Sequence, residues 1–148
     1  MSLITNRDTS KIFLFDNKYV KRTFKNISGG ALTLNGGEVI GAIRTGGDAG
    51  NYYLCGHTAT DGTQIPFGVN KSATAELADD ETIEITICVA GDVAASKLTF
   101  AGATTLASLS DSVVGDDTDI RSIQDRLMSD TLGIYLQTTD ELTGYDNE

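Results

Sequence analysis

The sequence has only one histidine, His57, and two cysteines, Cys55 and Cys88, so it is poor in the residues that most often carry catalysis or hold metals. These side chains cannot supply the four ligands of a tetrahedral zinc site. Each cysteine lies in an apolar, strand-like run, which favours two buried free thiols over a disulfide or a metal pair. We therefore predict no metal site.

His57 is also isolated from the partners that an enzyme would need. It adjoins Gly56 beside a polar loop, and no serine or cysteine nearby forms a recognisable nucleophile motif. Asp117-x-Asp119 lacks the glycine and the terminal glutamate of a calcium loop. We therefore expect an ordinary turn histidine, no cofactor and no enzymatic activity. A small hydrolase using His57 is the alternative.

Long apolar runs and a basic surface are absent too. No run approaches the ~20 apolar residues of a membrane helix. The start, MSLITNRDTSK, has no apolar region of the signal-peptide kind, so we expect a protein made in a cytoplasm, without a membrane partner. The net charge of −10 argues against binding to nucleic acid. A length of 148 residues fits one domain.

Charge is distributed unevenly along the chain. Residues 1–25 contain six basic and two acidic side chains, a net charge of +4, so the other 123 residues carry −14. The basic set is Arg7, Lys11, Lys18, Lys21, Arg22 and Lys25, against Asp8 and Asp16. Either this basic segment contacts a partner, or it pairs with the acidic body of its own or a neighbouring subunit. The sequence leaves both open.

Short β-strands are predicted along most of the chain. Residues 12–23 are apolar, aromatic and β-branched around Asp16-Asn17, which indicates two short strands and a turn. Glycine pairs at 29–30, 36–37 and 46–47 separate further runs. Residues 82–87 alternate Thr/Glu with isoleucine, the pattern of a half-buried strand. The other expected strands are 31–34, 39–43, 52–55, 65–69 and a short one near 97–102.

One helix is predicted near the C-terminal end, at about 118–129. Ile120, Ile123, Leu127 and Met128 would form one apolar stripe, Asp116 or Asp117 would cap the start, and Gly133 would end it. Many short strands and one late helix predict a mainly β fold, a small β-barrel or sandwich. We expect an N-terminal arm at 1–15, one β-rich domain at 16–139 and an acidic tail at 140–148.

Three blocks of sequence, in this order, resemble the head decoration proteins of tailed bacteriophages, of the lambda type. The first block is Gly37, Val39, Ile40, Gly41 and Ile43; the second is Asp61, Gly62, Thr63, Gln64, Pro66 and Gly68; the third is Val89, Gly91 and Asp92. Asp-Gly turns and Gly-Asp strand ends are common singly, and the specificity lies in their order and spacing. The resemblance covers roughly residues 30 to 100, about half of the chain.

This resemblance implies a tulip-like β domain without catalysis, in the virion. Such proteins sit as homotrimers on the outside of the expanded head and hold neighbouring subunits of the major capsid protein together. The alternative is another virion component, such as a tail or fibre-associated β-domain.

Two segments are the candidate contact sites. Lys11, Ile12, Phe13, Leu14 and Phe15 would form a capsid-binding arm that adds a strand to the shell, or else the first strand of the domain. In the stretch TDGTQIPFGV, residues 60–69, Asp61-Gly62 makes a bend and the only proline, Pro66, fixes its exit. We expect Asp61, Gly62, Thr63, Gln64 and Pro66 to present a rigid corner to a trimer mate or to the shell. A corner without a partner is the alternative.

Overall fold

The computed structural model of the chain describes residues 11–111 and 119–137. Its elements are β1 (Phe13–Lys25), β2 (Leu32–Leu34), β3 (Val39–Ala42), β4 (Tyr52–Leu54), β5 (Pro66–Asn70), β6 (Ala75–Leu77), β7 (Thr82–Ala94), the short 3-10 helix η1 (Ala95–Lys97), β8 (Leu109–Asp111), β9 (Ile120–Ser122), α2 (Ile123–Ser129) and β10 (Ile134–Gln137). The prediction of a mainly β domain with one short helix near its C-terminal end is confirmed.

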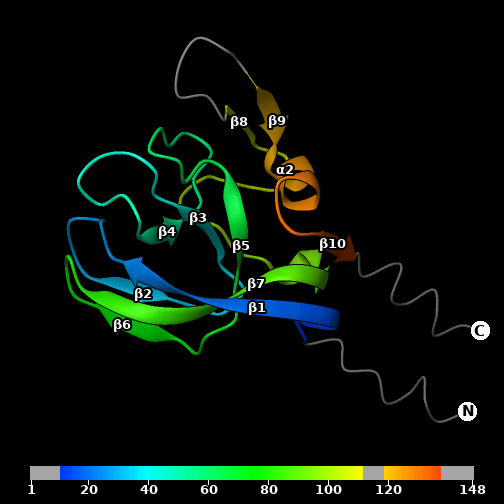
Figure 1. The fold of residues 1–148 in the computed structure, drawn as a ribbon, viewed down its shortest axis with the longest axis horizontal. Helices are drawn as coiled ribbons and strands as arrows, with labels where there is room; N and C mark the ends of the chain where they lie inside the picture. Colours follow the sequence, from blue (N-terminus) through cyan, green and yellow to red (C-terminus); the bar gives the residue numbers. More distant parts are fainter. Residues whose placement is uncertain (1–10, 112–118, 138–148) are drawn as a thin grey trace, which may run out of the picture.

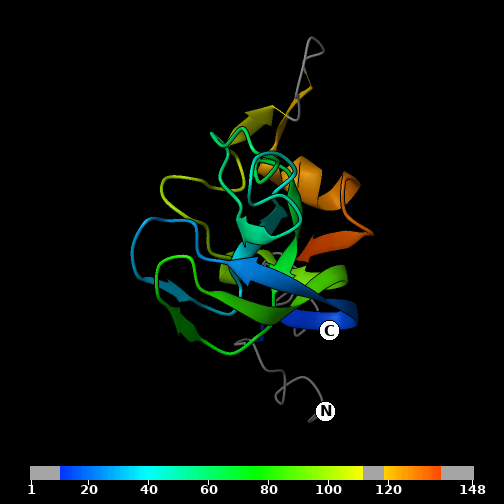
Figure 2. The same cartoon turned by 60° about the vertical axis from the view of Figure 1, so that its left-hand side comes forward.

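The main sheet has six strands and curls back on itself. Its order is β1-β4-β3-β5-β7-β10, and β1 also pairs with β7 along ten registered positions. β1, β4, β3, β5 and β7 therefore form a ring (Figure 1). β10 lies outside the ring and pairs with the last residues of β7, Gly91 to Ala94, on the edge that β5 pairs with at Ile87 and Cys88. Two smaller ladders, β2–β6 and β8–β9, lie at opposite ends of the molecule, with α2 next to β9 and β10 (Figure 2).

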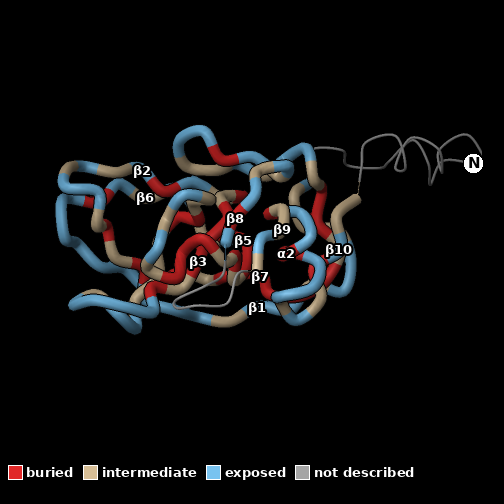
Figure 3. The backbone as a smooth tube through the Cα atoms, turned by 90° about the horizontal axis from the view of Figure 1, so that it is seen from above, coloured by how far each residue is buried: buried red, intermediate tan, exposed pale blue. Residues whose placement is uncertain are grey.

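Apolar side chains form two clusters on the two sides of the ring's wall. One contains Phe24, Leu34, Ile40, Leu54, Leu77, Ile85, Ile87 and Val89; the other contains Val39, Cys55, Val69, Cys88, Val93, Ile123, Leu127 and Ile134. Consecutive residues of one strand enter different clusters, as Ile87 and Cys88 do, because successive side chains point to opposite faces. The buried segments accordingly run through the middle of the molecule and the exposed ones around it (Figure 3).

The strand predicted at 82–87 is longer and more buried than its alternation suggested. β7 continues to Ala94, and Ile85 and Ile87 are buried as expected, while Ile83 is exposed. From Cys88 to Gly91 every residue is buried, because the second cluster covers the other face. Residues 95–97 form a 3-10 turn and Thr99 makes one isolated bridge to Glu38, so the short strand expected near 97–102 is wrong.

The two strands predicted in residues 12–23 are one continuous strand with an irregularity. β1 keeps its pairing with β7, but the register shifts between Phe13 and Tyr19, and Asp16 has a positive φ of 53°. A bulge, not a turn, therefore accommodates Asp16-Asn17. Gly91, with φ of 111°, lies against it: a Cβ there would stand 2.7 Å from the Cα of Asn17.

The helix is shorter than predicted and its apolar stripe is smaller. Ser122 caps it by accepting a hydrogen bond from the Asp125 amide, and the helix ends at Ser129, before Gly133. Ile120 pairs with Asp111 in the β8–β9 ladder and is exposed, as is Met128, so only Ile123 and Leu127 of the expected stripe are buried. The caps proposed at Asp116 and Asp117 lie outside the described residues.

Candidate functional site

The segment from Lys11 to Phe15 begins the domain. Phe13, Leu14 and Phe15 belong to β1, with Phe13 opposite Val93 and Phe15 opposite Asp92 on β7. The Ile12 carbonyl accepts a hydrogen bond of 2.8 Å from the Ala94 amide. The arm boundary predicted at residue 15 is therefore wrong, because the backbone of residues 13–15 is already paired within this chain. Residues 1–10, the rest of the predicted arm, lie outside the described residues, as does the predicted tail at 140–148.

The side chains of this segment divide between core and surface. Ile12 and Phe13 are partly buried against the second cluster, and the Phe13 ring meets the Tyr19 ring edge-on at 6.0 Å between centroids. Lys11 and Phe15 are exposed, Phe15 to 61 %. Tyr135 on β10, 58 % exposed, is opposite the same residue, Asp92, from the other side of β7. Asp92 on β7 is thus flanked by two exposed aromatic residues, Phe15 on β1 and Tyr135 on β10.

The stretch from Asp61 to Pro66 folds as the tight corner that the sequence predicted. The Asp61 carboxylate accepts hydrogen bonds from the Thr63 amide at 3.0 Å and the Thr63 hydroxyl at 2.6 Å, an Asx turn. Gly62, with φ of 110°, has a conformation that suits glycine. Pro66 starts β5 opposite Gly41, where the register of the ladder shifts, a place that tolerates a missing amide donor.

This corner faces inward, however, so the expectation that it presents a surface is wrong. Thr63 and Gln64 are 2 % and 1 % exposed, and Gly62 and Pro66 are also buried. The Gln64 side chain accepts a hydrogen bond from the Gly62 amide at 2.8 Å, within the corner itself. Only Asp61 is half-buried. The polar groups of the corner form hydrogen bonds with one another, because a buried donor or acceptor without a partner is costly.

The three blocks that carry the family resemblance meet in space. β3 holds most of the first block, β5 begins with the last two residues of the second, Pro66 and Gly68, and the third lies near the end of β7. The pairs β3–β5 and β5–β7 are hydrogen-bonded neighbours. The glycines of these blocks share one property: a Cβ on any of them would stand under 3.0 Å from another part of the chain. They are Gly37, Gly41, Gly62, Gly68 and Gly91. The blocks therefore mark close backbone approaches that this fold requires.

The two cysteines are buried and free, as predicted. Burial raises the pKa of the Cys55 thiol to about 12, although the nearby Arg126 opposes the shift. Burial also raises the pKa of Cys88, against a hydrogen bond from Asn17. Both thiols are held in the protonated, unreactive form at neutral pH.

We therefore expect neither cysteine to react with a thiol reagent while the protein is folded. Native protein at pH 8 should show no modification by Ellman's reagent over minutes, and the same protein in concentrated urea should show two reacting thiols. Rapid native modification of one thiol would contradict this burial.

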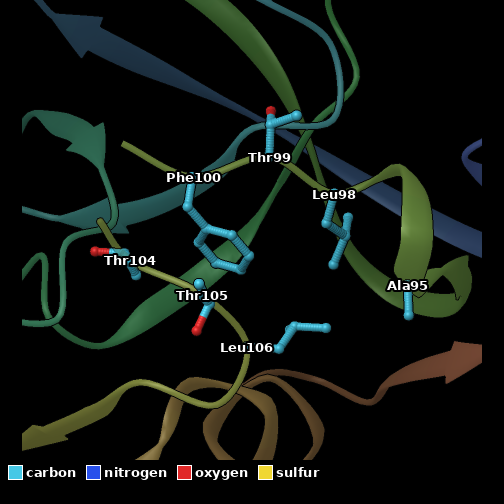
Figure 4. A pocket seen from close by; sticks show the side chains of 7 residues that line it. All are labelled: Ala95, Leu98, Thr99, Phe100, Thr104, Thr105 and Leu106. Carbon is cyan, nitrogen blue, oxygen red and sulfur yellow. The ribbon is translucent and has the colours of Figure 1, made fainter. Parts of the chain in front are cut away.

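A shallow hollow of about 440 Å³ opens beside the second cluster, near His57. Its lining is Ala95, Leu98, Thr99, Phe100, Thr104, Thr105 and Leu106, and the side chains of Leu98, Phe100 and Leu106 point towards it (Figure 4). His57 Nδ1 lies 2.9 Å from the Thr104 hydroxyl, which also accepts a hydrogen bond from the His57 amide. This is a turn histidine held by a threonine, with apolar surface beside it.

Sequence reasoning missed an arginine pair that holds the C-terminal elements together. Arg126 is completely buried and donates to the Ser110 hydroxyl and carbonyl, to the Asp119 carbonyl and to the Asp130 carboxylate. Arg121 contacts Asp130 at 2.7 Å as well as Asp119 and Asp125. The spacing of Arg126 and Asp130, four residues apart, was the available signal. That spacing does not predict that the Arg126 guanidinium is buried.

The basic N-terminal part of the chain pairs partly with the chain's own acids. The Lys25 ammonium lies 2.5 Å from Asp48 and 3.8 Å from Asp80, and the hydrogen bond to Asp48 raises the lysine pKa. Lys21 lies 3.8 Å from Glu84. For these two lysines the structure matches the alternative of pairing within the subunit. Arg22 contacts no carboxylate of the described residues within 4.0 Å.

In the part of the chain that the structure describes, no group of three or more His, Cys, Asp or Glu side chains could hold a metal ion. The same residues contain no helix of the length and apolarity that crossing a bilayer requires. A scan against protein-family models and a search of curated proteins find no match to this chain. The evidence for a function therefore lies in the chain's own residues and contacts.

Proposed function

We propose that this chain is a bacteriophage capsid decoration protein that binds the outer surface of the expanded head as a homotrimer and stabilises it. The observation that carries the proposal is the meeting of the three resemblance blocks on β3, β5 and β7, at positions where the fold needs glycine. The mainly β ring is the kind of domain that the resemblance implies.

The exposed aromatic side chains of Phe15 and Tyr135 are candidates for the surface that contacts the shell. Phe15 and Tyr135 flank Asp92, and large exposed apolar side chains gathered on one surface mark interaction sites. Lys11 is exposed in the same segment, at the start of the described chain. In this proposal Lys11 and Phe15 contact the shell by their side chains, while the backbone of residues 13–15 stays in the sheet.

A decoration protein stabilises a shell because it binds the assembled lattice and not the separate subunits. The stabilisation then grows with the concentration of the protein relative to its dissociation constant. Each of the three copies in a trimer engages a shell subunit, so individually weak contacts combine into strong attachment.

Sedimentation with heads tests the proposal. Purified protein is mixed with undecorated heads of the phage that encodes it, either before or after expansion, and the heads are pelleted. We expect the protein in the pellet of expanded heads, saturating at a fixed ratio to the shell subunit, and not with unexpanded heads. Protein that stays in the supernatant of both would contradict the proposal.

Two deletions separate attachment from folding. Removing residues 1–10 leaves every described contact in place, whereas removing 1–15 also deletes the pairing of Phe13 and Phe15 with β7. We expect the longer deletion to lower the melting temperature and the shorter one to leave it unchanged. If the shorter deletion alone abolishes pelleting, residues 1–10 carry the attachment; if it has no effect, the described surface carries it.

A further inference from the structure

A cleft of about 300 Å³ lies between the ring and the turn that joins α2 to β10. Its apolar wall is formed by Val20, Phe67, Val89 and Leu132, from β1, β5, β7 and that turn. Leu132 is 79 % exposed, the largest exposure among the big apolar side chains of the described residues. Two arginines, Arg22 and Arg44, also line the cleft. An apolar wall with cations at its rim suits a ligand that combines an apolar group with an acidic one.

The Arg22 side chain is oriented by aromatic neighbours. Its guanidinium carbon lies 5.6 Å from the centroid of the Phe67 ring, and its Nε donates to the Tyr52 hydroxyl at 3.2 Å. One terminal nitrogen donates to the Lys21 carbonyl at 2.8 Å. Within the described ranges, 11–111 and 119–137, no carboxylate lies within 4.0 Å of the Arg22 guanidinium. Its charge is thus held over an aromatic face without a neutralising acid.

Arg44 is placed by the tight corner. Its Cβ and Cγ pack so closely on Gly62 that a Cβ at Gly62 would stand within 3.0 Å of both, and its amide donates to the Asp61 carbonyl at 2.7 Å. The corner at Asp61-Gly62 therefore fixes the position of the Arg44 backbone and of the first part of its side chain. Arg44 is exposed, and its guanidinium has no ion pair with any described residue.

Asp130 is the acidic side chain that lines the cleft, and it is already neutralised. Its carboxylate lies 2.7 Å from Arg121 and 2.9 Å from Arg126. Two positive charges therefore remain uncompensated at the rim of one cleft, on a chain whose net charge is −10. Such a local excess attracts an anionic group from solution.

We propose that this cleft binds an acidic segment of the capsid shell, with carboxylates on Arg22 and Arg44 and an adjacent apolar side chain on the wall formed by Phe67 and Leu132. This assignment rests on the proposed function, which supplies the shell as partner. Arginine's planar guanidinium binds carboxylates through two parallel hydrogen bonds, which fixes the orientation of the segment. The apolar wall favours a peptide over an inorganic anion, which would leave that wall wet.

A charge-reversal pair tests the cleft on the full-length protein. Arg22→Glu with Arg44→Glu is compared with Lys18→Glu with Lys21→Glu, which changes the net charge equally on an exposed part of the same β1 strand. Binding to expanded heads is measured by pelleting at increasing protein concentration. We expect the arginine pair to weaken binding ~10- to 100-fold and the lysine pair to stay within ~3-fold of the unaltered protein.

The outcomes separate the cleft from the wider proposal. Equal binding by both variants would overturn the cleft's assignment and leave the decoration function standing. Failure of the unaltered protein to bind expanded heads would overturn the decoration function itself. The neutral pair Arg22→Gln with Arg44→Gln, with an unchanged melting temperature, guards against misfolding and should still weaken binding; normal binding by a folded neutral pair would count against the cleft.

Discussion

Replacing Arg126 with methionine is expected to lower the free energy of unfolding by about 3 kcal/mol. The guanidinium is fully buried, and its loss removes donors from the Ser110 carbonyl, the Asp119 carbonyl and the Asp130 carboxylate. Methionine fills much of the space but donates no hydrogen bond. Most of the cost comes from the buried Ser110 carbonyl, which loses this donor, because Asp130 keeps its contact with Arg121 and Asp119 is partly exposed.

Arg121→Met is the matched control for this experiment. Arg121 contacts Asp119 and Asp130 too, but its side chain is 31 % exposed, so water replaces the lost contacts. We expect it to cost at most about 1 kcal/mol. Urea denaturation followed by circular dichroism measures both changes. Equal destabilisation by the two substitutions would contradict the view that burial of Arg126 sets its importance.

The second large effect is expected at Gly68, where β5 approaches β7 closely. A Cβ at this position would overlap the Cys88 carbonyl oxygen and stand 2.5 Å from Ile87 Cγ2. Because the obstacle includes backbone, relief requires the two strands to separate. We expect Gly68→Ala to cost about 3 kcal/mol, at the upper end of overpacking penalties.

Gly56→Ala is the control, because no atom lies within 4 Å of a Cβ there and its φ is not in the left-handed region. It should change the free energy of unfolding by less than about 0.5 kcal/mol. Thermal melts of the two variants make the comparison. A melting temperature for Gly68→Ala close to that of Gly56→Ala would show that β5 and β7 do not approach as described.

Local patterns predicted several of the longer strands, because alternating burial and separating glycines can be recognised in short stretches of sequence. They missed the three-residue strands β6, β8 and β9. The strands at 52–55 and 65–69 were found within one residue, and the buried thiols followed from the apolar runs around them. The Asx turn at Asp61 was likewise local, since its hydrogen bonds span two residues.

The misses depend on contacts between residues far apart in the chain. Thr63 and Gln64 look like surface residues by composition, but Gly41 lets the corner pack against β3, which buries them. Ile120 fits a helical stripe, yet pairing with Asp111 takes it into a strand. Arg126 looks like a surface helix residue until the Ser110 strand covers it. Arg22 and Arg44, 22 positions apart, share a cleft only after folding.

Imaging of reconstituted heads tests the central claim most directly. Undecorated expanded heads are incubated with the purified protein, washed and reconstructed by electron cryo-microscopy. Our account predicts three-fold knobs on the outer surface at the local three-fold positions, each accommodating three copies of the β ring. A smooth shell, or added density confined to the tail, would contradict it.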